Sequence, residues 1–169
     1  IARDHLYTVG QANLSAFDIT NAEAPVLNNV QNIGWNIETI YPLKDKLFIG
    51  SQIGMQIFSI DNPDAPQWIS SFAHACFNDP VVANDTHAFV TLRAIAGQTT
   101  CMIGTPQSNE MDVVNITDLA QPSLVKIYEM EEPKGLSLDE NHLFLCDGKG
   151  GFKVYDITDV SSIQLITKF

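Results

Sequence analysis

Phe17-Asp-Ile-Thr20, Phe58-Ser-Ile-Asp61, Val114-Asn-Ile-Thr117 and Tyr155-Asp-Ile-Thr158 are four copies of one short pattern, and they decide the predicted fold. The second residue of each copy, here called the anchor, is Asp18, Ser59, Asn115 or Asp156. The anchors lie 41, 56 and 41 residues apart (18 to 59, 59 to 115, 115 to 156). A recurring interval of this kind is the signature of a repeat architecture. The longer middle interval indicates an insertion in the third unit.

Each unit contains short runs of β-branched and aromatic residues separated by turn residues, and helical periodicity is missing throughout. We predict four antiparallel strands per complete unit. In the second unit they are 37–41, 46–50, 55–60 and 67–72; in the third 80–83, 88–92, 111–116 and 124–128; in the fourth 135–138, 142–146, 152–157 and 163–167. Four strands at a period near 41 predict an all-β β-propeller.

The blades are expected at 5–32 (partial), 33–74, 75–130 with an insertion at 94–109, and 131–169. The first unit lacks its innermost strand. We therefore expect about four consecutive four-stranded blades that form part of a larger propeller, or one whose remaining blades are a separate piece.

Turn chemistry supports the repeat. Each anchor is a short polar residue that can bond its own downstream backbone. Five residues before the anchors, Asn13, Gly54 and Gly151 tolerate the positive φ of a tight hairpin, whereas Glu110 belongs to the enlarged hairpin. Seven residues after the first three anchors come Pro25, Pro66 and Pro122, whose missing N–H suits the start of an edge strand, whereas the fourth unit has Ile163.

The amino-acid composition argues against several classes of protein. The net charge is −11, and the nine Lys and Arg are scattered, which argues against nucleic-acid binding. A hydrophobic share of 45% with 9% aromatics argues against disorder. No apolar run approaches the roughly 18 residues that span a bilayer, so no transmembrane segment is expected.

The units resemble the LVIVD repeat of bacterial and archaeal cell-surface β-propellers. The resemblance is carried by Leu14-Ser-Ala-Phe-Asp-Ile-Thr-Asn-Ala-Glu-Ala-Pro-Val-Leu27, Phe58-Ser-Ile-Asp-Asn-Pro-Asp-Ala-Pro66 and Phe152-Lys-Val-Tyr-Asp-Ile-Thr158. Asp79-Pro-Val-Val82, Ala88-Phe-Val-Thr-Leu-Arg93 and Leu143-Phe-Leu-Cys-Asp-Gly148 look like a branch of envelope proteins common in Bacteroidota. Two anchors depart from the usual Asp of the family, since they are Ser59 and Asn115. In the fourth unit, Ile163 takes the place of the usual Pro. The resemblance implies a location in the cell envelope, at the outer-membrane surface as a lipoprotein or extracellular. It suggests binding and carries no catalytic residues to transfer.

Three cysteines should approach one face of the propeller, because links between blades and turns between second and third strands emerge there. A Cys76–Cys101 disulfide would fix the insertion to its own blade and would fit an oxidising compartment. Three unlinked thiols are the first alternative. A metal site of His74 with the three cysteines is the second, although its spacing is not customary for zinc. The odd cysteine, Cys146, is expected to be reduced in the core.

The insertion is the candidate binding element, since long loops on rigid scaffolds often carry function. Ile95, Met102 and Ile103 add apolar groups to its polar stretch, and Arg93 and His74 complete the candidate binding set. The alternative is a loop that merely caps the propeller.

The leading interpretation is a non-enzymatic envelope propeller that binds a protein or surface glycan through the face with the insertion, without a cofactor. One alternative is a structural subunit of an outer-membrane complex. The other is an enzyme with a central-channel site, for which the inner-strand suspects are Glu38, Asp79, Arg93 and Lys134.

Other polar and aromatic residues have structural interpretations. The acidic turns 61–64 and 156–159 could attract Ca²⁺, but they lack the spacing of a calcium loop. His5, His87 and His142 recur just before the second strand of their blades, which favours a structural role. Trp35 and Trp68, like Phe48 and Phe58, are expected in the blade core.

Overall fold

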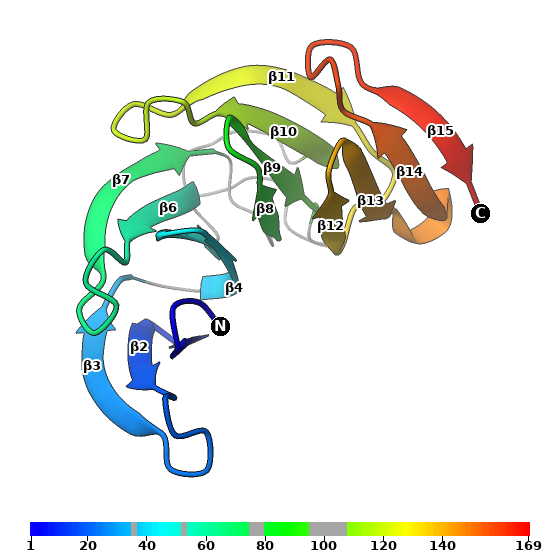
Figure 1. Cartoon of the computed structure of the whole chain (residues 1–169). Coiled ribbons are helices and arrows are strands. Elements are labelled where there is room, and N and C mark those ends of the chain that lie inside the picture. The colour runs from blue at the N-terminus through cyan, green and yellow to red at the C-terminus, as the bar shows by residue number, and fades with distance from the viewer. Residues whose placement is uncertain (35–36, 52–53, 75–79, 95–107) are drawn as a thin grey trace.

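The computed structural model describes residues 1–34, 37–51, 54–74, 80–94 and 108–169. They form four antiparallel sheets arranged as an arc around a common axis (Figure 1). This is the β-propeller that the sequence predicts, with one sheet per blade. The only helical element in the described part of the chain is the short 3₁₀ turn η1 (Gly148–Gly150).

The strands follow chain order from the axis outward in every blade. Blade 1 has β1 (His5–Gly10), β2 (Asn13–Asp18) and β3 (Val26–Asn32). Blade 2 has β4 (Ile37–Leu43), β5 (Lys46–Ser51), β6 (Gly54–Ser59) and β7 (Gln67–Ala73). Blade 3 has β8 (Val81–Ala83), β9 (His87–Leu92), β10 (Glu110–Asn115) and β11 (Ser123–Glu129). Blade 4 has β12 (Leu136–Asp139), β13 (His142–Cys146), β14 (Phe152–Asp156) and β15 (Gln164–Lys168). The described sheet of blade 1 therefore has three strands and begins with the second strand of the repeat.

The anchors end β2, β6, β10 and β14, the third strand of each repeat unit, and start the following turn as predicted. The side-chain oxygens of Asp18, Asn115 and Asp156 accept the backbone N–H two residues downstream at 2.8, 2.9 and 2.8 Å. Ser59 Oγ accepts the equivalent bond from Asp61 at 3.1 Å. These bonds reverse the chain toward the outer strand of each blade.

Two glycines allow the second and third strands of a blade to join tightly. Gly54 has φ 150° and Gly151 has φ 80°. A Cβ on Gly54 would lie 2.4 Å from the Phe72 carbonyl oxygen, and a Cβ on Gly151 would lie 2.2 Å from the Phe169 carbonyl oxygen. Neither site therefore accepts a side chain. In blade 1 the prediction for Asn13 is wrong: Gln11 takes the positive φ, at 55°, because the turn consists of Gln11 and Ala12 between the paired residues Gly10 and Asn13.

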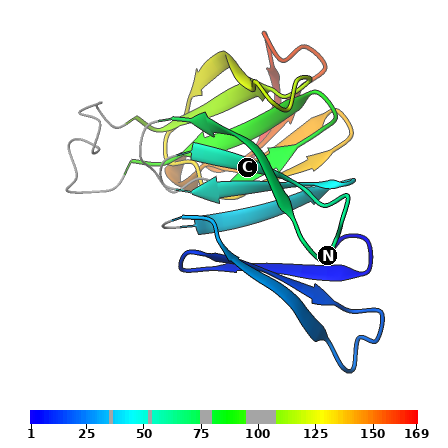
Figure 2. The same cartoon turned by 90° about the vertical axis from the view of Figure 1, so that its left-hand side faces the viewer.

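The hydrophobic core lies at the junctions between neighbouring blades, and each junction uses equivalent positions of the repeat. We call the side of each sheet that is turned to the next blade in chain order its trailing face, and the opposite side its leading face. Figure 2 shows the sheets stacked in this order from blade 1, drawn in blue. Three trailing positions recur and are buried in each of the first three blades: Tyr7, Leu14 and Ala16; Phe48, Met55 and Ile57; Phe89, Met111 and Val113. They pack on the leading face of the next blade.

Two predictions about burial are wrong. Trp68 is 60% exposed, because it lies on the outer strand β7, away from the junctions between blades. Cys146 is exposed, because it shares the trailing side of blade 4 with Phe144, and no described blade covers that side. The prediction holds for Phe48 and Phe58, which are buried, while Trp35 lies outside the described residues.

No helix in the described part of the chain has the length and the apolar character that crossing a membrane requires.

Candidate functional site

The base of the insertion is held by one side chain. Asn109 Oδ1 accepts the backbone N–H of Ala94 at 2.8 Å, and Asn109 Nδ2 donates to the Glu131 carbonyl oxygen at 2.6 Å. The Asn109 carbonyl oxygen accepts the N–H of Met130 at 2.9 Å. The two ends of the insertion are therefore joined to each other and to the link between blades 3 and 4. We call this end of the propeller the insertion face.

The candidate binding residues are only partly within the described structure. Arg93 follows β9 directly and lines a cavity near the axis. His74 follows β7, with its ring centroid 6.4 Å from that of Phe72, and is not among the residues that line this cavity. Ile95, Met102 and Ile103, the proposed Cys76–Cys101 disulfide and the alternative metal site that uses these cysteines lie outside the described residues.

The axial cavity has a volume of about 290 Å³ and is lined by residues on or beside the innermost strands: Glu38, Thr39, Pro80, Arg93, Lys134 and Gly135. It brings together three of the four residues suspected for a central-channel site, while Asp79 lies outside the described residues. Lys134 is fixed by its backbone, since its carbonyl oxygen accepts the Thr91 hydroxyl at 2.9 Å. Its Nζ lies 3.4 Å from Glu132 Oε1. The described lining carries two cations and one carboxylate, which suits an anionic group of a ligand.

Neither the cavity nor the rest of the described chain groups three residues of the kinds His, Cys, Asp and Glu in a way that could hold a metal ion. In the turn 156–159, Asp156 and Asp159 accept the backbone N–H groups of Thr158 and Ser161. In the turn 61–64, Asp61 accepts the Ser59 hydroxyl and Asp64 accepts the Asn28 side-chain amide.

A buried carboxyl group lies on β10, close to the insertion. Asp112 is buried, and Oδ1 has no hydrogen-bond partner among the described residues. Burial, helped by the nearby charge of Glu110, raises the pKa of Asp112 to about 7. A group with this pKa can take up or release a proton near neutral pH.

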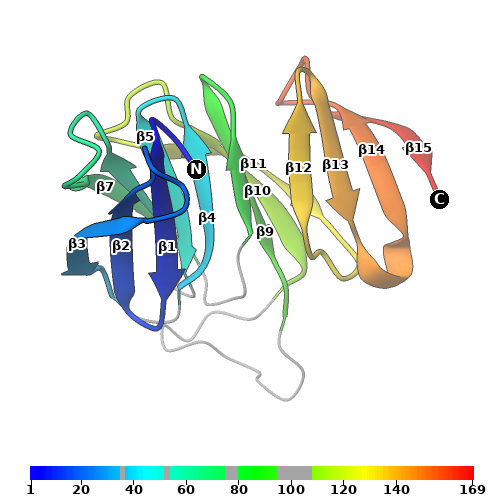
Figure 3. The same ribbon diagram turned by 60° about the horizontal axis from the view of Figure 1, so that its bottom comes forward.

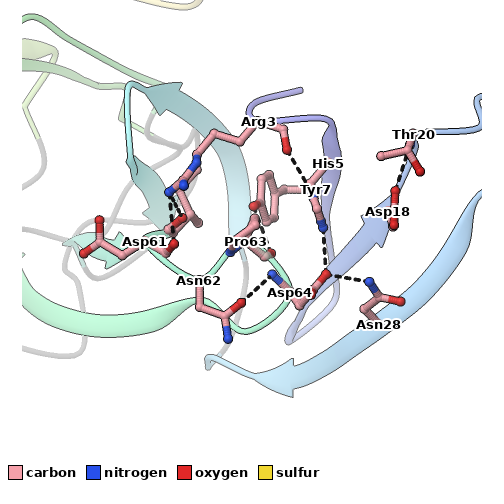
Figure 4. A network of polar contacts seen from close by, with 11 residues as sticks. Arg3, His5, Tyr7, Asp18, Thr20, Asn28, Asp61, Asn62, Pro63 and Asp64 are labelled. Atoms are coloured by element: carbon pink, nitrogen blue, oxygen red, sulfur yellow. Dashed lines mark hydrogen bonds and ion pairs between the residues drawn. The ribbon is translucent and has the colours of Figure 1, made fainter.

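At the opposite end of the propeller, a polar network joins blades 1 and 2 (Figure 4). His5 Nε2 lies 2.7 Å from Asp64 Oδ1, and His5 Nδ1 lies 2.8 Å from the Arg3 carbonyl oxygen. The Arg3 guanidinium donates to the Ile60 carbonyl oxygen at 2.7 Å. The Tyr7 hydroxyl donates to the Pro63 carbonyl oxygen at 2.9 Å. We call Arg3, His5 and Asp64 the clasp. It gives His5 the structural role that the sequence favours.

The next junction lacks the clasp. The repeat places Lys46 where blade 1 has His5, and Ala120 where blade 2 has Asp64, so the carboxylate is missing. Lys46 bonds its neighbour Asp45 instead. A cavity of about 370 Å³ lies at this junction, between the charged pair Lys44–Asp85 and an apolar floor that includes Phe48. The sequence did not indicate this cavity.

The clasp makes one contribution to stability pH-dependent. Burial of the His5 ring opposes its protonation, but the hydrogen bonds to the Arg3 carbonyl and to Asp64 outweigh burial and raise the pKa of His5 above 6.5. The hydrogen bonds from His5 and Asn28 lower the pKa of Asp64 below 3.8. Because a raised histidine pKa stabilises the fold below pH 6.5, this contribution is lost as pH rises through the folded value. Likewise the Asp64 contribution is lost as pH falls through its own folded value.

We therefore expect the clasp to stabilise the protein most between about pH 4 and 6.5. Asp64→Asn keeps the hydrogen-bond acceptor but removes the charge, so its deficit in urea midpoint relative to wild type should be largest in this window and shrink above it. The measurement is urea unfolding at pH 5, 6, 7 and 8. A deficit that grows from pH 6 to 8 would contradict the assigned role. His87→Gln is the matched control, because burial lowers the pKa of His87 and its contribution has the opposite sign.

The comparisons with known proteins agree with this architecture. Residues 106–130 and 133–169 match the LVIVD repeat family. These two segments are similar to LVIVD repeats. The matched segments cover the end of blade 3 and nearly all of blade 4. No sequence among the curated proteins matches this chain.

Solved structures share the fold at low sequence identity. The computationally designed protein Ika4 is 11% identical with a TM-score of 0.68, and the match covers 92% of this chain and 87% of Ika4. The designed protein Ika8 is 13% identical with a TM-score of 0.64, over 100% of this chain and 47% of Ika8. The N-terminal domain of Nup159 is 6% identical with a TM-score of 0.56, over 98% of this chain and 45% of that chain. The chain thus spans about half the length of two of these structures.

Proposed function

We propose that this LVIVD-repeat chain is a non-enzymatic propeller of the cell envelope, which binds a protein or a surface glycan through its insertion face. The observation that carries the proposal is the double hydrogen bond of Asn109, which joins both ends of the insertion to the link at Glu131. A loop fixed at its base can present side chains to a partner at a lower entropic cost than a loop on a mobile support. The envelope location rests on the resemblance to cell-surface LVIVD propellers.

The axial cavity supports the same face as the binding surface. Arg93 directly precedes the insertion, and Lys134 lies in the link between blades 3 and 4, to which Asn109 is hydrogen-bonded, so both cations belong to the insertion end of the axis. Arg93 and Lys134 can donate to a carboxylate or another anionic group on the partner, which would compete with Glu132 for Lys134.

The test replaces residues 94–109 with a two-residue turn and compares co-purification from envelope extracts with that of the wild-type chain. Loss of the partner, with an unchanged circular dichroism spectrum, is the expected result. The matched control is Lys44→Ala with Asp85→Ala, an exposed pair at the opposite end of the propeller, which should retain the partner. Equal recovery with and without the insertion would refute the proposal.

The cavity also gives the enzyme alternative a specific location, since Glu38, Arg93 and Lys134 all line it. Incubation with a panel of glycans and esters, with and without added metal ions, separates the two functions. Turnover that disappears in Lys134→Ala would favour catalysis at the axis over binding alone.

A further inference from the structure

The junction between blades 2 and 3 keeps two hydrogen-bond acceptors whose donor is present only at the junction between blades 1 and 2. At that first junction, the Arg3 guanidinium donates to the carbonyl oxygens of Ile60 and Asp61, just after β6, at 2.7 and 3.1 Å (Figure 4). At the second junction, the repeat places Ile116 and Thr117 at the same two positions. Within the part of the chain that the structure describes, no group donates a hydrogen bond to either of their carbonyl oxygens.

Lys44 takes the place of Arg3 in blade 2, but its side chain points elsewhere. The two residues begin from a similar backbone conformation, with φ 52° at Arg3 and 53° at Lys44. The Lys44 ammonium lies 2.6 Å from Asp85 Oδ1, and both side chains are about two-thirds exposed. Because exposed ion pairs of this kind are weak, an incoming cation can compete with Lys44 for Asp85.

The cavity of about 370 Å³ lies where a guanidinium in the position of Arg3 would be. Ile116 and Thr117 belong to its lining, and the apolar side chains of Leu43, Phe48 and Leu119 line it as well. The methylene groups of a long cationic side chain can pack on apolar surface of this kind while the charged end reaches polar groups. The cavity is also much larger than the space that a single water molecule needs.

The charges around the cavity favour a cation as its occupant. Asp45 and Asp85 belong to the lining, and Asp61 Oδ1 lies 4.0 Å from the Lys46 ammonium. These three carboxylates face two ammonium groups, those of Lys44 and Lys46. Lys46 already forms an ion pair with Asp45. The local balance of charge is therefore negative, and the net charge of the chain, −11, has the same sign.

We propose that this cavity binds an arginine side chain of a partner protein. The guanidinium donates to the carbonyl oxygens of Ile116 and Thr117, as the Arg3 guanidinium does at the first junction, and pairs with Asp85 at the rim. Arginine fits better than lysine, because a guanidinium presents five N–H donors in a planar fork and can reach three separate acceptors at once. The inference does not depend on the proposed function, since the cavity and the insertion face lie at opposite ends of the propeller.

The first experiment titrates the ¹⁵N-labelled chain with Nα-acetyl-arginine N-methylamide and follows the backbone amide resonances. We expect saturable shifts confined to residues 43–48, 84–85 and 116–119, with a dissociation constant of about 1 mM. The corresponding lysine derivative should bind at least about tenfold more weakly. Equal binding of the two derivatives, or shifts spread over the whole chain, would overturn the proposal.

Free arginine distinguishes a protein side chain from a small metabolite as the source of the guanidinium. Its α-carboxylate meets the acidic rim of the cavity, so it should bind more weakly than the derivative, in which this charge is absent. If free arginine bound more tightly than the derivative, the choice of a partner protein would be wrong.

Lys44→Arg tests the site by filling it from within the chain. The new guanidinium starts from the backbone position that corresponds to Arg3, so it should occupy the two carbonyl oxygens and weaken binding of the arginine derivative about tenfold or more. Because the net charge stays the same, a general attraction of cations to this acidic chain would leave the binding unchanged. Unchanged binding would therefore refute the site.

Asp85→Asn removes the carboxylate at the rim and should also weaken binding of the arginine derivative, by about threefold or more. Glu23→Gln is the matched control, because it removes the same charge from an exposed turn of blade 1 and should leave the binding unchanged. Circular dichroism checks that each variant folds, which the exposure of all three altered side chains favours. If Asp85→Asn and Glu23→Gln lost binding equally, attraction over a long range would explain the result and the proposal would fail.

Discussion

Replacing Asp147 by alanine is expected to lower the free energy of unfolding by about 3–5 kcal/mol, because it removes one partner of a buried ion pair. The Asp147 side chain is fully buried, and Oδ2 lies 2.5 Å from Lys153 Nζ. Oδ1 also accepts the backbone N–H groups of Glu131 and Glu132 at 3.0 and 2.7 Å. One carboxylate thus joins the end of β13, the strand β14 and the link between blades 3 and 4.

The alanine variant leaves several donors without an acceptor. Burial opposes the charge on Lys153, but its hydrogen bond to Asp147 outweighs burial and raises the pKa of the lysine. Without the carboxylate, the ammonium group and two backbone N–H groups lose their partner in a largely buried region. The penalty therefore comes from three unsatisfied donors as well as from the lost attraction.

Chemical denaturation monitored by tryptophan fluorescence measures this effect. Asp147→Asn, which keeps an acceptor for the backbone, should lose less than the alanine variant. Asp85→Ala is the matched control, because Asp85 forms a 2.6 Å ion pair with Lys44 in which both side chains are about two-thirds exposed. Such a pair contributes about 1 kcal/mol or less. Equal losses in Asp147→Ala and Asp85→Ala would show that the buried cluster does not stabilise blade 4.

The repeat made the fold predictable because each turn is determined locally. The anchor Asp156 and its acceptor role depend only on the residues beside it, and the same holds for Asp18. A second set of turn residues follows three positions after each anchor and accepts the backbone N–H two residues downstream: Asn21, Asn62, Asp118 and Asp159. The recurrence of this set at a fixed offset is visible in the sequence, but the prediction of the turns used only the anchors.

Contacts between blades were less predictable, because they join residues far apart in the sequence. His5 and Asp64 are separated by 59 positions, and nothing near either residue indicates the other. Asp147 was read only as part of a family motif, whereas its partners lie in the preceding link and on β14. The wrong predictions of which side chains are buried have a similar cause. Trp68 has core chemistry, but its strand lies at the outer edge of the blade, and a single sequence does not rank strands by exposure.

Replacing Phe89 by alanine is the second change with a large expected effect, a loss of about 3–5 kcal/mol in the free energy of unfolding. Phe89 is fully buried on β9 and packs with Met111 and Val113 against Leu143 and Leu145 of blade 4. Removing the ring leaves a cavity at the junction, since the rigid sheets on both sides limit collapse.

Trp68→Ala is the matched control for Phe89→Ala, because it removes a still larger aromatic side chain from an exposed position on β7. Surface substitutions usually change stability by about 0.5 kcal/mol, so the control should lose far less than the core variant. Urea unfolding followed by circular dichroism at 218 nm measures both, at one protein concentration so that association is held constant. If Trp68→Ala lost as much as Phe89→Ala, stability would not be concentrated at the junctions between blades.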